Sequence, residues 1–251
     1  MLFDWLLAPF RHRRRERLLA EPFPAEWLAH LERLPFYQAL DERGRARVRD
    51  DLRVLVAEKH WEGCGGLELT DAIKVTIAAQ ASLLLLNLDH DYYPDVQSIL
   101  VYPSTFRPPP RMDAHGVVGP SQPHLGEAWR KGPVVLTWDA ALGGAMHPHD
   151  GHNLVLHEFA HALDLLDGLA DGTPPLARDA LRDWVATMTR EYRALADAAE
   201  HGRATLLDHY GATNPAEFFA VATECFFEQP QRLRERHAEL YELLRGYYQQ
   251  D

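Results

Sequence analysis

Cysteine is nearly absent from this sequence, and its scarcity excludes one large class of proteins. The chain has only Cys64 and Cys225 among its 251 residues. Small secreted proteins that use disulfides to support a thin core carry many more cysteines. The apolar N-terminus is followed by the basic run RHRRRER, which reverses the order found in a signal peptide. We therefore expect a cytoplasmic protein without a disulfide framework.

Long apolar runs are also missing. The longest one, Ile77 to Leu88, is about half of the roughly 20 residues that a membrane-spanning helix requires. We interpret it as a buried helix and expect no stable insertion into a membrane.

Positive charge is in short supply as well. Lys and Arg total 26 against 37 Asp and Glu, which gives a formal net charge of −11. A surface that binds nucleic acid needs cations to displace counterions from phosphates, so we expect no nucleic-acid partner. The exception is the basic segment Arg11 to Arg17. We interpret residues 1–20 as a solvated, mobile N-terminal arm, with contact to an anionic membrane as the alternative.

The hydrophobic content of 46% is enough for residues 21–251 to form a single domain. Apolar and charged residues alternate between Pro24 and Lys59, which predicts two or three amphipathic helices with breaks at Pro35 and Gly44. Strands are predicted at the following places: a short one after the Gly-rich turn in EGCGGLELTD, residues 98–106, residues 132–139, and optionally a hairpin strand around residues 115–118.

Later helices are marked by capping residues. Thr70 or Asp71 can cap the helix over the apolar run, and Asn153 can cap a helix from about Leu154 to Leu166. Further helices are predicted over residues 177–200, between Asn214-Pro215 and Pro230, and over residues 233–248. The expected fold class is α+β, mainly helical, with a sheet of about three or four strands beside the helix at residues 154–166.

That helix contains the sequence HEFAH. Residues four apart on a helix lie about 40° apart around its axis, so His157 and His161 can share one metal ion. Glu158 would then reach the water on that ion and act as a general base. The alternative is a helix that places two histidines one turn apart by chance. The apolar residues around the motif favour the metal, because unpaired buried histidines are costly.

A hydrolytic zinc site needs a third protein ligand, and the spacing leaves candidates open. Asp167 could coordinate or cap the helix, and Asp164 is open to a similar capping or supporting role. Asp179 and Asp183 stand where a thermolysin-type enzyme has a glutamate. Glu217 is the remaining candidate, although with Asn214 as N-cap it could instead close a capping box.

Two motifs carry a family resemblance. VLHEFAHALDLLDG and HYGATNPAEFFAVATECFF, together with GLELTD, ILVYPSTF and GPVVLTWD, resemble the Mlc titration factor A family of bacterial zinc peptidases. The likeness covers nearly the whole chain after about residue 20. The stretch YGATNPAEFFA is also distantly similar to the protease domain of anthrax lethal factor.

The resemblance implies a zincin-like metallopeptidase that binds one Zn²⁺ through His157, His161 and Glu217. Glu158 would be the general base and Tyr210 the active-site tyrosine. The expected substrates are peptides or proteins, with aminopeptidase-like action on short peptides, and the expected state is a monomer. The strand at Pro133–Trp138 could align an extended substrate. An Mlc-like transcriptional repressor is a further expected partner, and the alternative function is a non-catalytic regulator that sequesters such a repressor.

Overall fold

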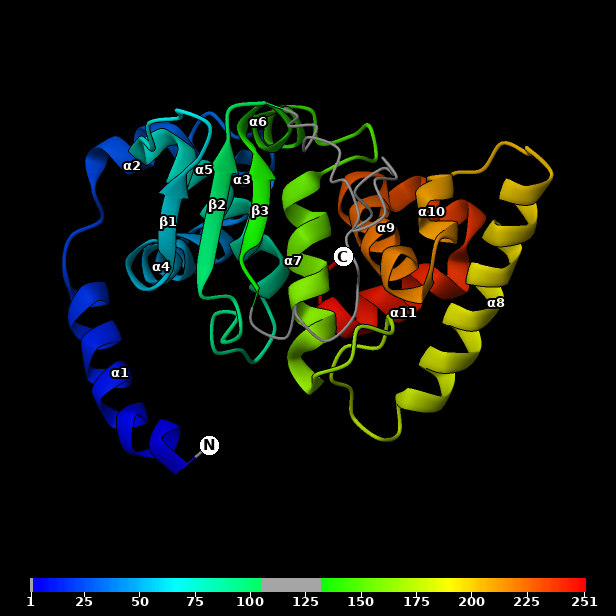
Figure 1. The fold of residues 1–251 in the computed structure, drawn as a ribbon, viewed down its shortest axis with the longest axis horizontal. Coiled ribbons are helices and arrows are strands. Elements are labelled where there is room, and N and C mark those ends of the chain that lie inside the picture. The colour runs from blue at the N-terminus through cyan, green and yellow to red at the C-terminus, as the bar shows by residue number, and fades with distance from the viewer. Residues whose placement is uncertain (1, 105–131) are drawn as a thin grey trace, which may run out of the picture.

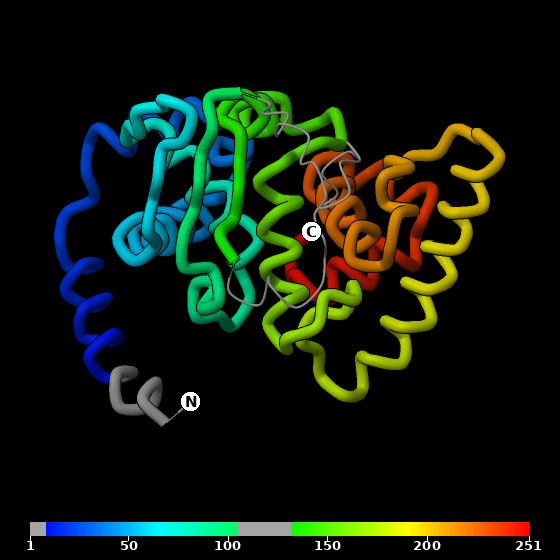
Figure 2. The backbone as a smooth tube through the Cα atoms, in the orientation of Figure 1, coloured from blue at the N-terminus to red at the C-terminus, as the bar shows by residue number. Residues whose placement is uncertain are grey.

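The computed structural model describes the backbone of residues 2–104 and 132–251, and the side chains from residue 9 onward within them (Figures 1 and 2). Within these residues the chain is mainly helical with one small sheet, which confirms the predicted α+β class. The hairpin strand considered around residues 115–118 lies outside the described residues.

The first part of the chain supplies four helices, then a strand, a buried helix and a second strand. In order these are α1 (Leu2–Ala20), α2 (Ala25–Leu31), α3 (Pro35–Ala39), α4 (Glu42–Glu58), β1 (His60–Gly63), α5 (Asp71–Leu85) and β2 (Ser98–Tyr102). As predicted, Thr70 caps α5 by accepting a hydrogen bond from the Ile73 backbone N–H. Most of the apolar run after it, up to Leu85, is buried in this helix, as expected.

The second part begins with the third strand and is otherwise helical. It consists of β3 (Val134–Thr137), α6 (Trp138–Met146), α7 (Leu154–Asp164), η1 (Leu165–Asp167), α8 (Leu181–Glu200), η2 (His209–Ala212), α9 (Pro215–Glu228), α10 (Pro230–Arg236) and α11 (Ala238–Tyr248). Asn153 and Asn214 cap α7 and α9 through their side-chain oxygens, as their positions in the sequence predicted.

The sheet has the order β1-β2-β3, and both pairings are parallel. Ile99 and Val101 of β2 are buried, together with their partners Val134 and Leu136 of β3, whereas Val135 is 38% exposed. Helices α4 and α5 lie behind the sheet in the view of Figure 1, and α7 runs beside β3. The arrangement places α7 between the edge of the sheet and α9 (Figure 1).

Several predicted boundaries were wrong. Gly44 does not break a helix but lies in the first turn of α4, where its N–H donates to the Asp41 cap. The short strand expected after the Gly-rich turn lies ahead of it, as β1. The helix predicted over residues 233–248 is interrupted at His237, and the predicted strand at residues 132–139 ends at Thr137, where the unpredicted helix α6 begins.

The N-terminal arm is helical from Leu2 and touches α4. Arg15 forms ion pairs with Glu58 (2.7 Å) and with Asp91 (2.5 Å). The mobility expected for residues 1–20 stays a prediction. Across the described residues, no helix combines the length and the apolar character needed to cross a bilayer.

Candidate metal centre

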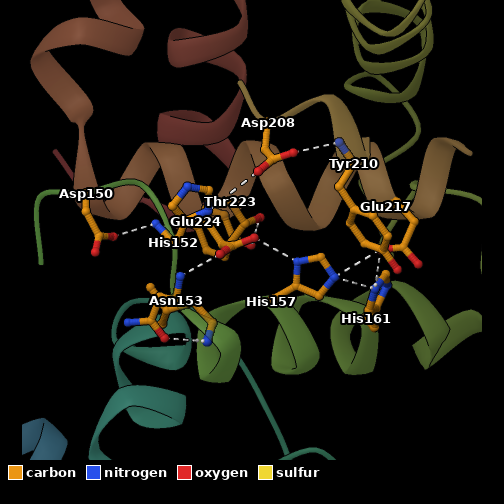
Figure 3. A network of polar contacts seen from close by, with 12 residues as sticks. Asp150, His152, Asn153, His157, His161, Asp208, Tyr210, Glu217, Thr223 and Glu224 are labelled. Atoms are coloured by element: carbon orange, nitrogen blue, oxygen red, sulfur yellow. Dashed lines mark hydrogen bonds and ion pairs between the residues drawn. The ribbon is translucent and has the colours of Figure 1, made fainter. Parts of the chain in front are cut away.

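Helix α7 positions the two histidines of the HEFAH sequence. Asn153 starts this helix by accepting from the Leu156 N–H, and the apolar residues around the motif are buried against the core. Because they are four residues apart on this helix, His157 and His161 point to the same side, with Nε2 atoms 3.2 Å apart and ring centroids 4.8 Å apart (Figure 3). His157 is buried and His161 is partly buried. The one-turn spacing brings the rings together as predicted.

Glu217 reaches the same point from α9, which packs against α7. Its Oε2 lies 3.0 Å from His157 Nε2 and 3.2 Å from His161 Nε2. Asn214 accepts from the Glu217 backbone N–H, but the Glu217 carboxylate itself is turned toward the imidazoles (Figure 3). Glu217 therefore takes part in the N-cap of α9 through its backbone N–H and in the cluster through its carboxylate.

The distances among these three donor atoms fit a single metal ion. Zinc bonds of about 2.0–2.1 Å in a tetrahedron place neighbouring ligand atoms about 3.3 Å apart. The observed separations of 3.0, 3.2 and 3.2 Å are close to that edge length. Among the described residues, His157, His161 and Glu217 form the one group of His, Cys, Asp or Glu side chains close enough to hold an ion together.

The electrostatics of the cluster favour a positive charge. Burial opposes protonation of His157, but hydrogen bonds to Glu217 and Glu224 outweigh it and raise the pKa of His157 to about 10. Burial likewise disfavours the charged form of Glu217, yet the two histidines lower the pKa of Glu217 to about 2. Either a proton or a metal ion can supply the positive charge that these carboxylates attract.

Glu224 completes the surroundings of His157, and the sequence reasoning missed its role. Its Oε1 lies 2.7 Å from His157 Nδ1, and its Oε2 accepts from the Asn153 N–H at 2.5 Å. Because a carboxylate only accepts hydrogen bonds, Nδ1 carries a ring hydrogen, and Nε2 is the nitrogen that would bind a metal ion in place of its own proton. The seven-residue spacing between Glu217 and Glu224, about two helical turns, was the available signal.

A buried polar network lies behind Glu224. The Asn153 amide group donates to Gln80 Oε1 at 3.0 Å and to Glu228 Oε1 at 3.1 Å. Gln80 in turn donates to the carbonyl oxygen of Ala141 in α6. The start of α7 is therefore fixed by α5, α6 and α9 together, which holds His157 in place.

The two predicted catalytic residues flank the cluster. Glu158 is partly buried beside the histidines, and burial raises its pKa. Tyr210 lies in η2, with its ring centroid 5.9 Å from that of His157, and 54% of its surface is exposed. Burial, and then the charge of Glu217, raise the pKa of Tyr210, so its phenol keeps the proton at neutral pH.

The other ligand candidates lie elsewhere. Asp167 is exposed and its Oδ1 accepts from the Leu169 N–H, while the buried Asp164 accepts from the Gly172 N–H. Asp179 and Asp183 are exposed around the start of α8. Cys225 is buried in the core.

Two histidines and a glutamate that converge from two helices of an α+β fold fit the class of metallopeptidases. A family model described as glucose-regulated metallo-peptidase M90 matches residues 10–249. The chain belongs to this metallopeptidase family, and the resemblance to the Mlc titration factor A family is confirmed.

Curated relatives match over almost the whole chain. An uncharacterized protein of Synechocystis sp. is 40% identical over 240 residues, which cover 94% of this chain and 87% of the relative. Mlc titration factor A of Serratia proteamaculans is 32% identical over 233 residues, covering 90% and 87%. Mlc titration factor A of Yersinia pestis is 30% identical over 232 residues, covering 90% and 85%.

Proposed function

We propose that this member of a metallopeptidase family hydrolyses peptide bonds with one zinc ion held by His157, His161 and Glu217. The observation that carries the proposal is the convergence of three donor atoms with mutual separations of 3.0–3.2 Å. Bound zinc would polarise the substrate carbonyl and acidify a water molecule.

Glu158 is the proposed general base. It accepts a proton from the water that attacks the carbonyl carbon, and it passes that proton to the nitrogen of the departing amine as the C–N bond breaks. Burial raises the pKa of Glu158, which makes its carboxylate a stronger acceptor for the proton of the attacking water.

Tyr210 is the proposed donor to the developing oxyanion. Its phenol remains protonated and lies beside the His157 ring at the exposed side of the cluster. A fixed donor at the position where negative charge develops lowers the barrier of acyl transfer.

β3 is the proposed guide for an extended substrate. Within the described residues it has a neighbouring strand on one side only, and α7 with the histidines lies next to it. Backbone groups at a sheet edge can pair with an added peptide strand. A peptide-bound structure with the substrate away from β3 would contradict this part of the proposal.

The name of two relatives supports a second function. The Serratia and Yersinia proteins are named Mlc titration factor A, so we also propose binding of an Mlc-like transcriptional repressor. A cytoplasmic location, a monomeric state and aminopeptidase-like action on short peptides stay predictions.

The Glu158→Gln variant separates these proposals. It removes the proton acceptor but keeps the ligands, so zinc should remain at one ion per chain while hydrolysis falls by at least a hundredfold. Zinc is measured by elemental analysis and hydrolysis with a mixed peptide library followed by mass spectrometry. Unchanged cleavage by the variant would refute catalysis at this site, whereas repressor binding that survives the change belongs to a separate surface.

A further inference from the structure

A cavity of about 390 Å³ lies next to residues that support the proposed metal centre. Its walls are the turn at residues 150–152 before α7, the segment at residues 204–209 before η2, and one face of α9. Each wall is close in sequence to a residue that supports or flanks the centre: His152 precedes Asn153, Asp208 accepts from the Tyr210 N–H at 2.8 Å, and Cys225 follows Glu224. In the view of Figure 3, His152 and Asp208, which form an ion pair, lie above α7.

The cavity combines an apolar floor with an acidic rim. Val221 and Cys225 of α9 are buried, as is Leu207, and they supply the floor. Asp150 and Asp208 are exposed and supply the rim. Among the described residues that line the cavity, none is lysine or arginine, and two are histidines, His152 and His209. Arg203, just before the lining segment, is paired with Asp197.

Asp208 is held only loosely at one of its two oxygens. Its Oδ1 accepts from the Tyr210 N–H at 2.8 Å, whereas its Oδ2 forms a long ion pair of 3.8 Å with His152 Nδ1 at an exposed position, which a cationic ligand can replace. A cation that enters the cavity meets the carboxylates of Asp150 and Asp208 on its rim.

We propose that this cavity binds the side chain of an arginine or lysine of the peptide substrate, close to the bond that is cleaved. The aliphatic stem of such a side chain packs on Val221 and Cys225, and its charged end reaches Asp150 and Asp208. This inference rests on the proposed peptidase function and adds a substrate class to it.

The test uses a set of N-terminally acetylated peptides. Each contains a single arginine at a different position of an otherwise neutral sequence, and each has a counterpart with citrulline in place of that arginine. Acetylation removes the N-terminal charge, and citrulline keeps the shape of arginine without its charge. With the zinc-loaded full chain, kcat/KM should favour arginine over citrulline by roughly five- to tenfold at one position. The ratio of kcat/KM for arginine to that for citrulline should fall toward one in Asp150→Asn and in Asp208→Asn. Both variants keep an oxygen that can accept from the His152 and Tyr210 N–H groups.

Asp183→Asn is the matched control, because it removes the same charge from an exposed site on α8. It should leave the ratio unchanged. A ratio near one in the unaltered chain, or a ratio that Asp183→Asn lowers as much as Asp208→Asn, overturns the proposal in favour of an apolar subsite or a general charge effect.

A binding measurement separates failure of the inference from failure of the proposed function. Fluorescence anisotropy gives Kd for labelled arginine and citrulline peptides on Glu158→Gln and on Glu158→Gln combined with Asp208→Asn. Tighter binding of arginine that the second change abolishes supports the cavity even if no peptide is cleaved. Equal Kd values for the two peptides overturn it even if hydrolysis is found.

Discussion

Glu224 Oε1 lies 2.7 Å from Nδ1 of His157, on the opposite side of the ring from the Nε2 atom that faces Glu217. The carboxylate fixes a ring hydrogen on Nδ1, so Nε2 is the nitrogen that would bind a metal ion held in the cluster. Both residues are buried, which shields this interaction from solvent. Glu224 is therefore a positioning residue for the proposed metal centre.

Replacing Glu224 by Gln should weaken zinc binding by about 10- to 100-fold, because the acceptor on Nδ1 loses its charge and its fixed orientation. Competition with a fluorescent zinc indicator measures this affinity. Glu200→Gln, at the exposed end of α8, is the control and should bind zinc like the unaltered chain. A folded Glu224→Gln protein with unchanged zinc affinity would contradict the positioning role.

Removal of Glu217 tests the third ligand directly. Glu217→Ala should lose stoichiometric zinc after dialysis, since two imidazoles alone leave the ion poorly held. Asp167→Ala should keep one zinc per chain, because its carboxylate accepts from the Leu169 N–H and lies outside the cluster. Elemental analysis of zinc in both variants shows which carboxylate binds the ion. Loss of zinc from Asp167→Ala, with zinc retained in Glu217→Ala, would make Asp167 the ligand.

Tyr210→Phe should reduce kcat by roughly 10²- to 10³-fold, the usual loss when a single oxyanion donor is deleted. KM and zinc content should change little, because the ring and the ligands remain. Tyr37→Phe, which removes a hydroxyl that accepts from Arg49 far from the cluster, is the control. A Tyr210 variant that turns over peptide at the normal rate would assign this tyrosine a packing role.

Glu228 should make stability depend on pH. Burial raises the pKa of Glu228 to about 8, against an ordinary value of 4.5, so the folded chain binds the proton more tightly than the unfolded one. The stabilisation is complete below about pH 4.5 and is lost as the pH rises through about 8, with a slope of at most ~1.4 kcal/mol per pH unit. Asp150, Asn153 and the Gly151 N–H are the groups that face this carboxyl.

Glu228→Gln should remove that dependence. The variant should match the unaltered chain near pH 5 and unfold at higher urea concentration than it near pH 9, with zinc present throughout. Urea titrations at several pH values measure the free energy of unfolding. Parallel pH profiles for the two proteins would show that Glu228 titrates in its ordinary range.

Local signals in the sequence were sufficient for the helices that carry the site. Asn153 and Asn214 mark the starts of α7 and α9, because a capping side chain acts within three residues of its own position. The helical spacing of His157 and His161 predicted their convergence for the same reason. Helix α6 was missed because its N-cap, Thr137, is also the last residue of the β-branched strand sequence VVLT and makes no side-chain cap hydrogen bond.

Long-range relationships were beyond the sequence. The parallel pairing of the strands joins segments that are far apart in the chain, so no local pattern encodes their order. Position alone could not decide whether the Glu217 carboxylate caps its own helix or reaches α7. The role of Glu224 depends on how α9 is rotated against α7, and only the packed structure defines that rotation.

His161 and Glu217 are 56 positions apart in the chain, yet their side chains lie within 3.2 Å of each other. An ion bound to both acts as a cross-link that closes the long excursion through α8, much as a disulfide would. Unlike a disulfide, the ion is released when the chain unfolds, so the free energy of its binding adds to the free energy of unfolding. Chelation should therefore lower Tm and loosen α8 before it loosens the sheet.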